Sequence, residues 1–127
     1  MKFTPALLAA IGAVSASDKI AIDLYFESKC PGCHAVITQS FPEAFNADGF
    51  FEMADVNFFP YGNAHESQQG DTWNFSCQHG APECAYNLVE TCGINKITCP
   101  KARFNFLLCV EQNVTSGDYE GTLKKCA

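Results

Sequence analysis

Two cysteines separated by two residues, Cys30 and Cys33, are the residues of this 127-residue chain best suited to chemistry. They follow a run from Ile20 to Phe26 in which apolar and less apolar residues alternate, as in a strand. Pro31 suits the first position of a helix, where its missing N–H would have had no partner. A CxxC pair at such a helix start lets the sulfurs form a disulfide, and free amide groups stabilise the first thiolate. We therefore expect Cys30 to attack a substrate disulfide and Cys33 to resolve the mixed disulfide.

Other interpretations of the pair are a purely structural disulfide and a zinc site, and the second is disfavoured because no second CxxC and no paired histidines accompany it. His34 is a candidate modulator of Cys30 ionisation, since it follows four residues later and carries a proton at acidic pH. The alternative for His34 is a solvated surface histidine. Asp23, on the less apolar face of the first strand, is a candidate buried proton acceptor, with an exposed acid as the alternative.

The segments around the pair predict an α/β fold. A helix is expected from Cys30 onward, broken or restarted by Pro42 and closed at Asp48-Gly49. A second alternating run then leads up to Pro60. A crossover of this length permits parallel pairing, so residues 17–62 are predicted to form a right-handed βαβ unit that carries the CxxC.

Beyond Tyr61 the sequence changes character, and residues 63–127 are predicted to form a disulfide-stapled helical subdomain. The stretch through Gly70 is expected to be a polar loop. Pro82 and Pro100 each open a helix, and Gly93 is placed to end the first. The expected apolar faces are Cys84, Ala85, Leu88, Val89 and Cys92 on the first helix, and Phe106, Leu107, Cys109 and Val110 on the second.

The N-terminus and the cysteines indicate the secretory pathway. A basic start and an apolar run to Val14 predict a signal peptide over residues 1–16, cleaved after Ala16. Eight cysteines behind such a leader imply an oxidising route. Asn74 and Asn113 begin glycosylation sequons. No second hydrophobic stretch approaches the roughly 20 residues of a membrane span.

The charge and the residue types limit the ligands and partners. The net charge of −6 argues against a nucleic-acid partner, which usually needs a basic stripe. No cofactor and no metal are predicted.

Residues 77 to 92 read CQHGAPECAYNLVETC. This resembles the signature of the γ-interferon-inducible lysosomal thiol reductase family, which is CQHG, two residues, EC, two residues, N, four residues and C. Every fixed position is present: Cys77, Gln78, His79, Gly80, Glu83, Cys84, Asn87 and Cys92. The upstream CxxC, the segment from Pro60 to Ala64 and the eight cysteines are similar to the same family.

The resemblance implies a thioredoxin-like fold with a helical insertion, and reduction of protein disulfides at acidic pH through Cys30 and Cys33. It implies a secreted or an endosomal or lysosomal protein, with disulfide-containing proteins as substrates and an unidentified reductant. His79 and Glu83 have an acid–base interpretation, but we expect their segment to be a disulfide-stapled structural element.

Six cysteines are expected in structural disulfides of unknown pairing: Cys77, Cys84, Cys92, Cys99, Cys109 and Cys126. Cys84 and Cys92 lie about 12 Å apart along one helix, and Cys99 and Cys109 lie further apart still. Neither pair meets the Cα limit near 7 Å. Several pairings of the six remain open.

One departure from the family pattern concerns the C-terminal half. A thioredoxin core needs two further antiparallel strands and a helix, and this ββα half is expected to be missing, since no proline stands at the head of a late strand. A two-stranded sheet is marginal alone. The chain is therefore expected to be a thiol reductase or part of one, or alternatively an impaired, truncated family member that acts as a secreted disulfide-rich binding or decoy protein.

Overall fold

A computed structural model describes residues 18–114 and 117–127 of the chain, so the predicted signal peptide and Thr115 of the second sequon lie outside the described residues. The elements are β1 (Ile20–Phe26), α1 (Pro31–Ala35), the π-helical turn η1 (Val36–Ser40), α2 (Phe41–Asn46), α3 (Phe50–Met53), β2 (Ala54–Pro60), β3 (His65–Gln69), β4 (Thr72–Ser76), α4 (Ala81–Lys96), α5 (Pro100–Glu111) and α6 (Tyr119–Cys126).

Strands β1 and β2 form the predicted parallel pair, in register from Ile20 opposite Ala54 to Phe26 opposite Pro60. Alternate residues of β2 are buried, as the period-two pattern predicts. The helical segments α1, η1, α2 and α3 make the crossover. The α/β class and the βαβ unit are therefore confirmed.

Proline and glycine divide the crossover into short pieces. Pro31 occupies the first turn of α1, where no intrahelical N–H is needed. Pro42 was expected to break or restart the helix, and the chain passes through η1 before α2 begins at Phe41. Gly49, with φ 79°, lies in the left-handed region just before α3.

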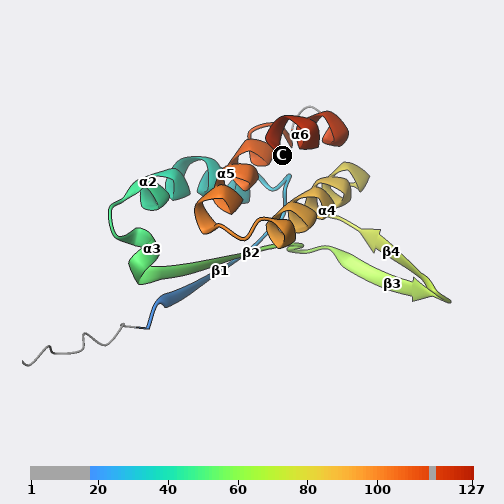
Figure 1. The fold of residues 1–127 in the computed structure, drawn as a ribbon. Coiled ribbons are helices and arrows are strands. Elements are labelled where there is room, and N and C mark those ends of the chain that lie inside the picture. The colour runs from blue at the N-terminus through green and yellow to red at the C-terminus, as the bar shows by residue number, and fades with distance from the viewer. Residues whose placement is uncertain (1–17, 115–116) are drawn as a thin grey trace, which may run out of the picture.

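The main core joins the two halves of the chain. Phe104 and Leu107 of α5 pack with Ile37, Phe45 and Phe58 in one buried cluster. The rings of Phe45 and Phe104 stack with their centroids 3.9 Å apart. The predicted boundary between residues 62 and 63 therefore separates segments that share a core. In Figure 1 the helices lie on one side of the β1–β2 pair, and hairpin β3–β4 extends beyond α4.

The segment after Tyr61 is a correction to the predicted polar loop. Residues His65–Gln69 pair in an antiparallel hairpin with Thr72–Ser76. Gly70, at φ 61°, allows the tight turn between the strands. All residues of both strands are exposed, so the segment has no buried face. Trp73 and Phe75 alternate with polar residues in β4, but β3 contains no apolar residue, so the alternation covers only one of the two strands.

Helix α4 corrects two further expectations. It does not end at Gly93 but continues to Lys96. Gly93 instead permits close packing, because a Cβ there would lie 2.1 Å from Cε1 of Phe106. The expected apolar face is also wrong, since Leu88 is 64% exposed and Cys92 is exposed, whereas the buried residues of α4 are Glu83, Tyr86, Asn87 and Glu90.

Two disulfides staple the second half. Cys77 bonds to Cys84 across the start of α4, and Cys109 bonds to Cys126, which ties α6 to α5. Cys92 and Cys99, which we expected in structural disulfides, are free thiols. Both side chains are exposed on the surface, so no surrounding core holds either thiol next to another cysteine.

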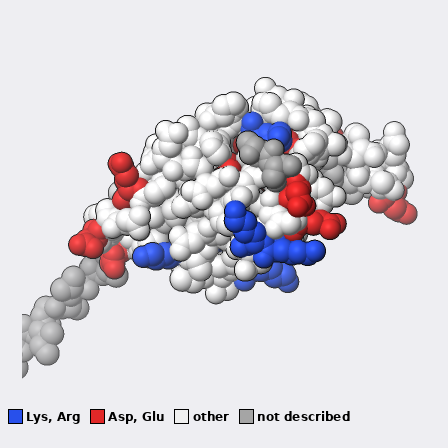
Figure 2. All heavy atoms as spheres, turned by 90° about the horizontal axis from the view of Figure 1, so that it is seen from above, with Lys and Arg blue, Asp and Glu red and all other residues white. Residues whose placement is uncertain are grey.

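Charged side chains occupy a small part of one face of the molecule. In Figure 2 basic side chains gather near the middle of this face with acidic side chains beside them, and most of the rest of the face is uncharged. Among the helices of residues 18–114 and 117–127, none combines the length and apolar character needed to cross a membrane.

Candidate functional site

Cys30 lies at the end of the loop that follows β1 and caps α1. Its backbone is extended (φ −74°, ψ 120°), and its carbonyl accepts the amide of His34 at 2.9 Å. Its own amide donates to the carbonyl of Glu27 at 3.2 Å. Cys30 and Cys33 are both free thiols and both half-buried. The strand, the loop and the helix start thus bring the two cysteines together as the sequence predicts.

The second cysteine of the pair, Cys33, holds its proton tightly. Burial raises the pKa of Cys33 to about 11, and its contact with the Cys30 thiol adds to the rise. A hydrogen bond with the backbone of Glu27 acts in the opposite direction. Cys33 is therefore a protonated thiol at neutral pH, and a proton must leave it before it can attack a disulfide.

The loop before the cysteines is held by buried polar groups of α4. The amide of Ser28 donates to Oδ1 of Asn87 at 3.0 Å, and the Ser28 hydroxyl donates to the carbonyl of Glu83 at 3.3 Å. Ser28 and Glu83 are fully buried. Sequence analysis missed Glu27 and Ser28, because two polar residues after a strand usually signal an exposed loop.

Glu27 belongs to a second polar cluster beside this loop. Its Oε1 accepts the amide of Asn63 at 2.5 Å, and its Oε2 lies 3.7 Å from Nδ1 of His79. His79 Nδ1 also lies 2.5 Å from Oε2 of Glu83, whose Oε1 accepts the His79 amide at 3.1 Å. Gly62 leaves room for Glu27, since a Cβ at Gly62 would lie 2.3 Å from Glu27 Cγ.

His34 contacts a carboxylate from the second half of the chain. Its Nδ1 lies 3.3 Å from Oε2 of Glu111 on α5. Burial raises the pKa of Glu111 to about 8. Burial, and then the charge of Glu111, raise the pKa of Glu90 well above its usual value. The proposed influence of His34 on Cys30 stays a prediction, and the structure adds Glu111 as a partner that the sequence did not suggest.

Asp23 is not a buried proton acceptor. It is exposed on β1 and accepts a hydrogen bond from Nδ2 of Asn57 at 3.0 Å. Outward-facing positions of β1 point away from the helix-covered side, so the alternative of an ordinary exposed acid holds.

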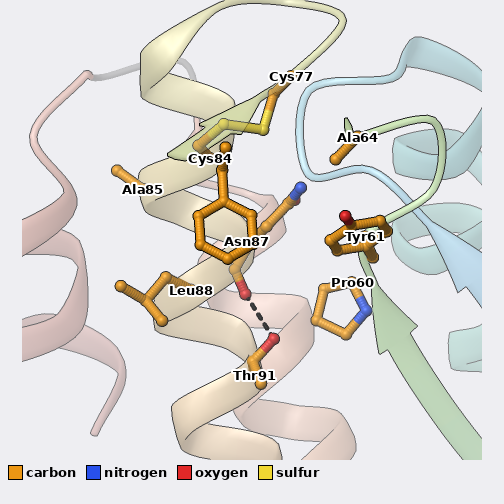
Figure 3. A pocket seen from close by; sticks show the side chains of 10 residues that line it. Pro60, Tyr61, Ala64, Cys77, Cys84, Ala85, Asn87, Leu88 and Thr91 are labelled. Carbon is orange, nitrogen blue, oxygen red and sulfur yellow. Dashed lines mark hydrogen bonds between the residues drawn. A yellow bond between two sulfur atoms is a disulfide. The ribbon is translucent and has the colours of Figure 1, made fainter. Parts of the chain in front are cut away.

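An apolar cavity of about 420 Å³ lies between β2, the hairpin and the first turns of α4. Figure 3 shows Pro60, Tyr61 and Leu88 around it, with the Cys77–Cys84 disulfide at one end. Asn87, which holds the CxxC loop, also lines this cavity. Asn87 therefore lines the cavity and also hydrogen-bonds the loop that leads into the thiols.

The two sequon asparagines occupy different settings. Asn74 is exposed on β4. Asn113 is half-buried, and its Nδ2 donates to the carbonyl of Cys109 at 2.7 Å while its Oδ1 accepts from Lys125 Nζ at 2.9 Å. Glycosylation at either position stays a prediction.

Comparison with known proteins shows which family the chain belongs to. The family model described as gamma interferon inducible lysosomal thiol reductase (GILT) matches residues 21–127. The chain belongs to the GILT family. A gamma-interferon-responsive lysosomal thiol protein of Arabidopsis thaliana is 36% identical over 97 residues, which cover 76% of this chain and 40% of the relative. A gamma-interferon-inducible lysosomal thiol reductase of Mus musculus is 34% identical over 111 residues, which cover 87% and 42%. The chain thus spans about two fifths of the length of these GILT relatives.

Several residues of the GILT signature make structural contacts in this chain. Its first cysteine, Cys77, is stapled to Cys84, and the loop between them turns the chain into α4. Glu83 and Asn87 then face the loop that precedes the CxxC. Two residues of the GILT signature, Glu83 and Asn87, are therefore hydrogen-bonded to the loop that leads into the CxxC.

Proposed function

We propose that this chain, as a GILT-family thiol reductase or part of one, reduces protein disulfides through Cys30 and Cys33. The observation that carries the proposal is the position of two free thiols at the start of α1, directly after β1 of the βαβ unit. Relatives that cover most of this chain are named thiol reductases. Since the chain spans about two fifths of the mouse relative, activity of this chain on its own belongs to the proposal.

The reaction proceeds in two exchanges. The Cys30 thiolate attacks one sulfur of the substrate disulfide, whose S–S bond breaks as a Cys30–substrate disulfide forms, and the departing thiolate takes a proton. Cys33 then loses its proton and attacks Sγ of Cys30. The second substrate thiol leaves, so the substrate gains two electrons and Cys30 and Cys33 become a disulfide. An external thiol must reduce that disulfide before another cycle.

Glu83 and Asn87 act in this proposal as positioning residues. They bind Ser28, two residues before Cys30, from a rigid helix whose start is stapled by the Cys77–Cys84 disulfide. Support of this kind fixes the loop and so keeps the helix start and the sulfur in place.

An endosomal or lysosomal setting, reached through the secretory pathway, is part of the proposal. The relatives carry the word lysosomal in their names. The raised pKa values of Glu90 and Glu111 also agree with a protein that works at acidic pH, because these buried carboxyls are neutral there.

Turnover of a disulfide-linked protein by the purified chain, with excess dithiol at about pH 5, tests the proposal. Cys30→Ser is expected to abolish turnover. In a single-turnover reaction without dithiol, Cys33→Ser is expected to stop after the first exchange and to accumulate the mixed disulfide, visible as a mass adduct on Cys30. Cys99→Ser removes an exposed free thiol that is not part of the CxxC and is the matched control, with turnover unchanged.

Equal turnover in wild type and Cys30→Ser would refute the proposed nucleophile. A folded wild-type chain without any turnover would instead support the alternative of a disulfide-rich binding protein, and the same assay on a longer chain would then show whether further sequence is needed.

A further inference from the structure

Three donor atoms from two distant segments converge beside the CxxC loop. They are Oε2 of Glu27, Nδ1 of His79 and Oε2 of Glu83, and all lie within 4.8 Å of one another. His79 Nδ1 lies 2.5 Å from the Glu83 oxygen and 3.7 Å from the Glu27 oxygen. The remaining carboxylate oxygens are bound elsewhere, to the amides of Asn63 and His79. The three atoms therefore face a shared point, held there by main-chain hydrogen bonds.

The Glu27 oxygen in this cluster lacks a hydrogen-bond partner. The side chain of Glu27 is only 3% exposed, that of Glu83 is fully buried, and Oε2 of Glu27 has no bonded donor. A buried carboxylate oxygen without a donor is costly. One imidazole cannot fully compensate two buried carboxylates, because even a protonated His79 leaves one negative charge.

We propose that Glu27, His79 and Glu83 bind one divalent cation of the zinc type. Imidazole nitrogen and carboxylate oxygen are zinc ligands, and three protein ligands leave a fourth position for water or another group. With a neutral imidazole, two carboxylates balance the charge of the ion and the unpartnered Glu27 oxygen gains a ligand bond. The side chain of His79 is 34% exposed, which provides a path for the ion from solvent.

This binding goes beyond disulfide reduction, since it uses neither Cys30 nor Cys33. The ion would join the loop that leads into the CxxC to the loop that opens α4. Glu27 lies three residues before Cys30, and its carbonyl accepts the Cys30 amide. A bound ion therefore stiffens the loop that leads into the two thiols.

Calorimetric titration with zinc at neutral pH tests the proposal on protein whose four free thiols, Cys30, Cys33, Cys92 and Cys99, have been alkylated and whose two disulfides are intact. Alkylation removes thiolate as a competing ligand and abolishes reductase activity, so the result is independent of the proposed function. We expect one zinc ion per chain and a zinc-dependent rise in Tm. Glu27→Gln, His79→Asn and Glu83→Gln should each weaken binding by at least about tenfold.

His65→Asn is the matched control, because His65 is exposed on β3 and lies outside the cluster; it should bind zinc as the unmutated protein does. Circular dichroism of each variant identifies any that does not fold, and Glu27→Gln alone is then decisive because it changes one oxygen to an amide. Absence of zinc binding in the folded protein would overturn the proposal. Equal affinity in Glu27→Gln would overturn it as well.

Discussion

At the scale of single residues, the loop that leads into the CxxC is held by hydrogen bonds between buried polar groups. Ser28 and Asn87 lie 59 residues apart in sequence and are joined by a hydrogen bond at 3.0 Å. Such a bond contributes modestly by itself, but loss of the acceptor leaves a buried amide without a partner. In this chain the asparagine of the GILT signature, Asn87, therefore accepts the hydrogen bond of a buried amide in the loop that leads into Cys30.

Asn87→Ala is expected to lower the free energy of unfolding by about 1–3 kcal/mol, because the buried amide of Ser28 loses its acceptor. Urea denaturation followed by circular dichroism measures the change. Asn95→Ala is the matched control: Asn95 is exposed on the same helix, where its Nδ2 donates to the carbonyl of Thr91, and its loss should cost less than about 0.5 kcal/mol. Similar losses in the two variants would contradict the assigned importance of the Asn87–Ser28 bond.

At the scale of elements, the packing of helices explains why Gly93 is a glycine within a 16-residue helix. Gly93 would be expected to weaken or end α4, since glycine in a helix interior costs about 1 kcal/mol relative to alanine. The Phe106 ring of α5 lies against it and leaves no space for a Cβ. Close approach of α4 and α5 therefore outweighs helix propensity at this position.

Gly93→Ala is expected to destabilise the chain by about 1–3 kcal/mol despite the better helix propensity of alanine, because the new methyl group clashes with Phe106. Thermal unfolding measures the loss. In the double variant Gly93→Ala/Phe106→Leu the smaller side chain gives room, so the two changes should be less destabilising together than their sum. Additive losses would show that the clash is relieved in another way.

The Cys109–Cys126 disulfide determines whether α6 stays packed on α5. The bonded residues are 17 apart in sequence, and a loop of that size corresponds to about 3 kcal/mol of stabilisation. Cys109→Ser/Cys126→Ser is expected to lose approximately this amount, measured by urea denaturation, and to increase amide hydrogen exchange first in α6. Unchanged exchange in α6 would show that its apolar contacts alone are sufficient.

At the scale of the whole molecule, the two halves of the chain are held together by one core and by buried acids. Phe104 and Leu107 complete the core of the βαβ unit. Beside it, Glu90 of α4 and Glu111 of α5 are fully buried, and His34 of α1 approaches Glu111. The same helices that complete the core thus carry carboxyls whose burial disfavours ionisation.

The stability of the chain should therefore fall as the pH rises from about 4.5 toward 8. Burial raises the pKa of Glu111 from 4.5 to about 8, so the folded chain holds this proton more tightly than the unfolded chain does. The stabilisation is complete below the unfolded pKa and is lost as the pH approaches the folded pKa. The free energy of unfolding should decrease by up to about 1.4 kcal/mol per pH unit for each such proton.

Urea denaturation at a series of pH values measures this slope. Glu111→Gln should flatten the curve, because the amide carries no titrating proton, whereas Glu43→Gln on the exposed start of α2 should leave it unchanged. Parallel curves for wild type and Glu111→Gln would contradict the role of Glu111.

Local rules were sufficient for the βαβ unit and the start of α1. Strand alternation, the proline after Cys30 and the crossover length depend on neighbours in sequence, so they predicted β1, β2 and the position of the CxxC. The hairpin β3–β4 was missed because β3 is polar throughout and only Trp73 and Phe75 of β4 alternate with polar residues. The buried face of α4 was missed because it carries Glu83, Asn87 and Glu90, which composition assigns to the surface.

The sequence by itself determined the family, through the spacing of the signature, and the pair of thiols, through the strand and proline around it. Only the tertiary structure decided that Ser28 bonds Asn87, that Glu27 meets His79 and Glu83, and that Glu111 reaches His34. The physical reason is that a periodic pattern reports which residues avoid water. It does not report which distant polar group satisfies a polar residue once both are buried.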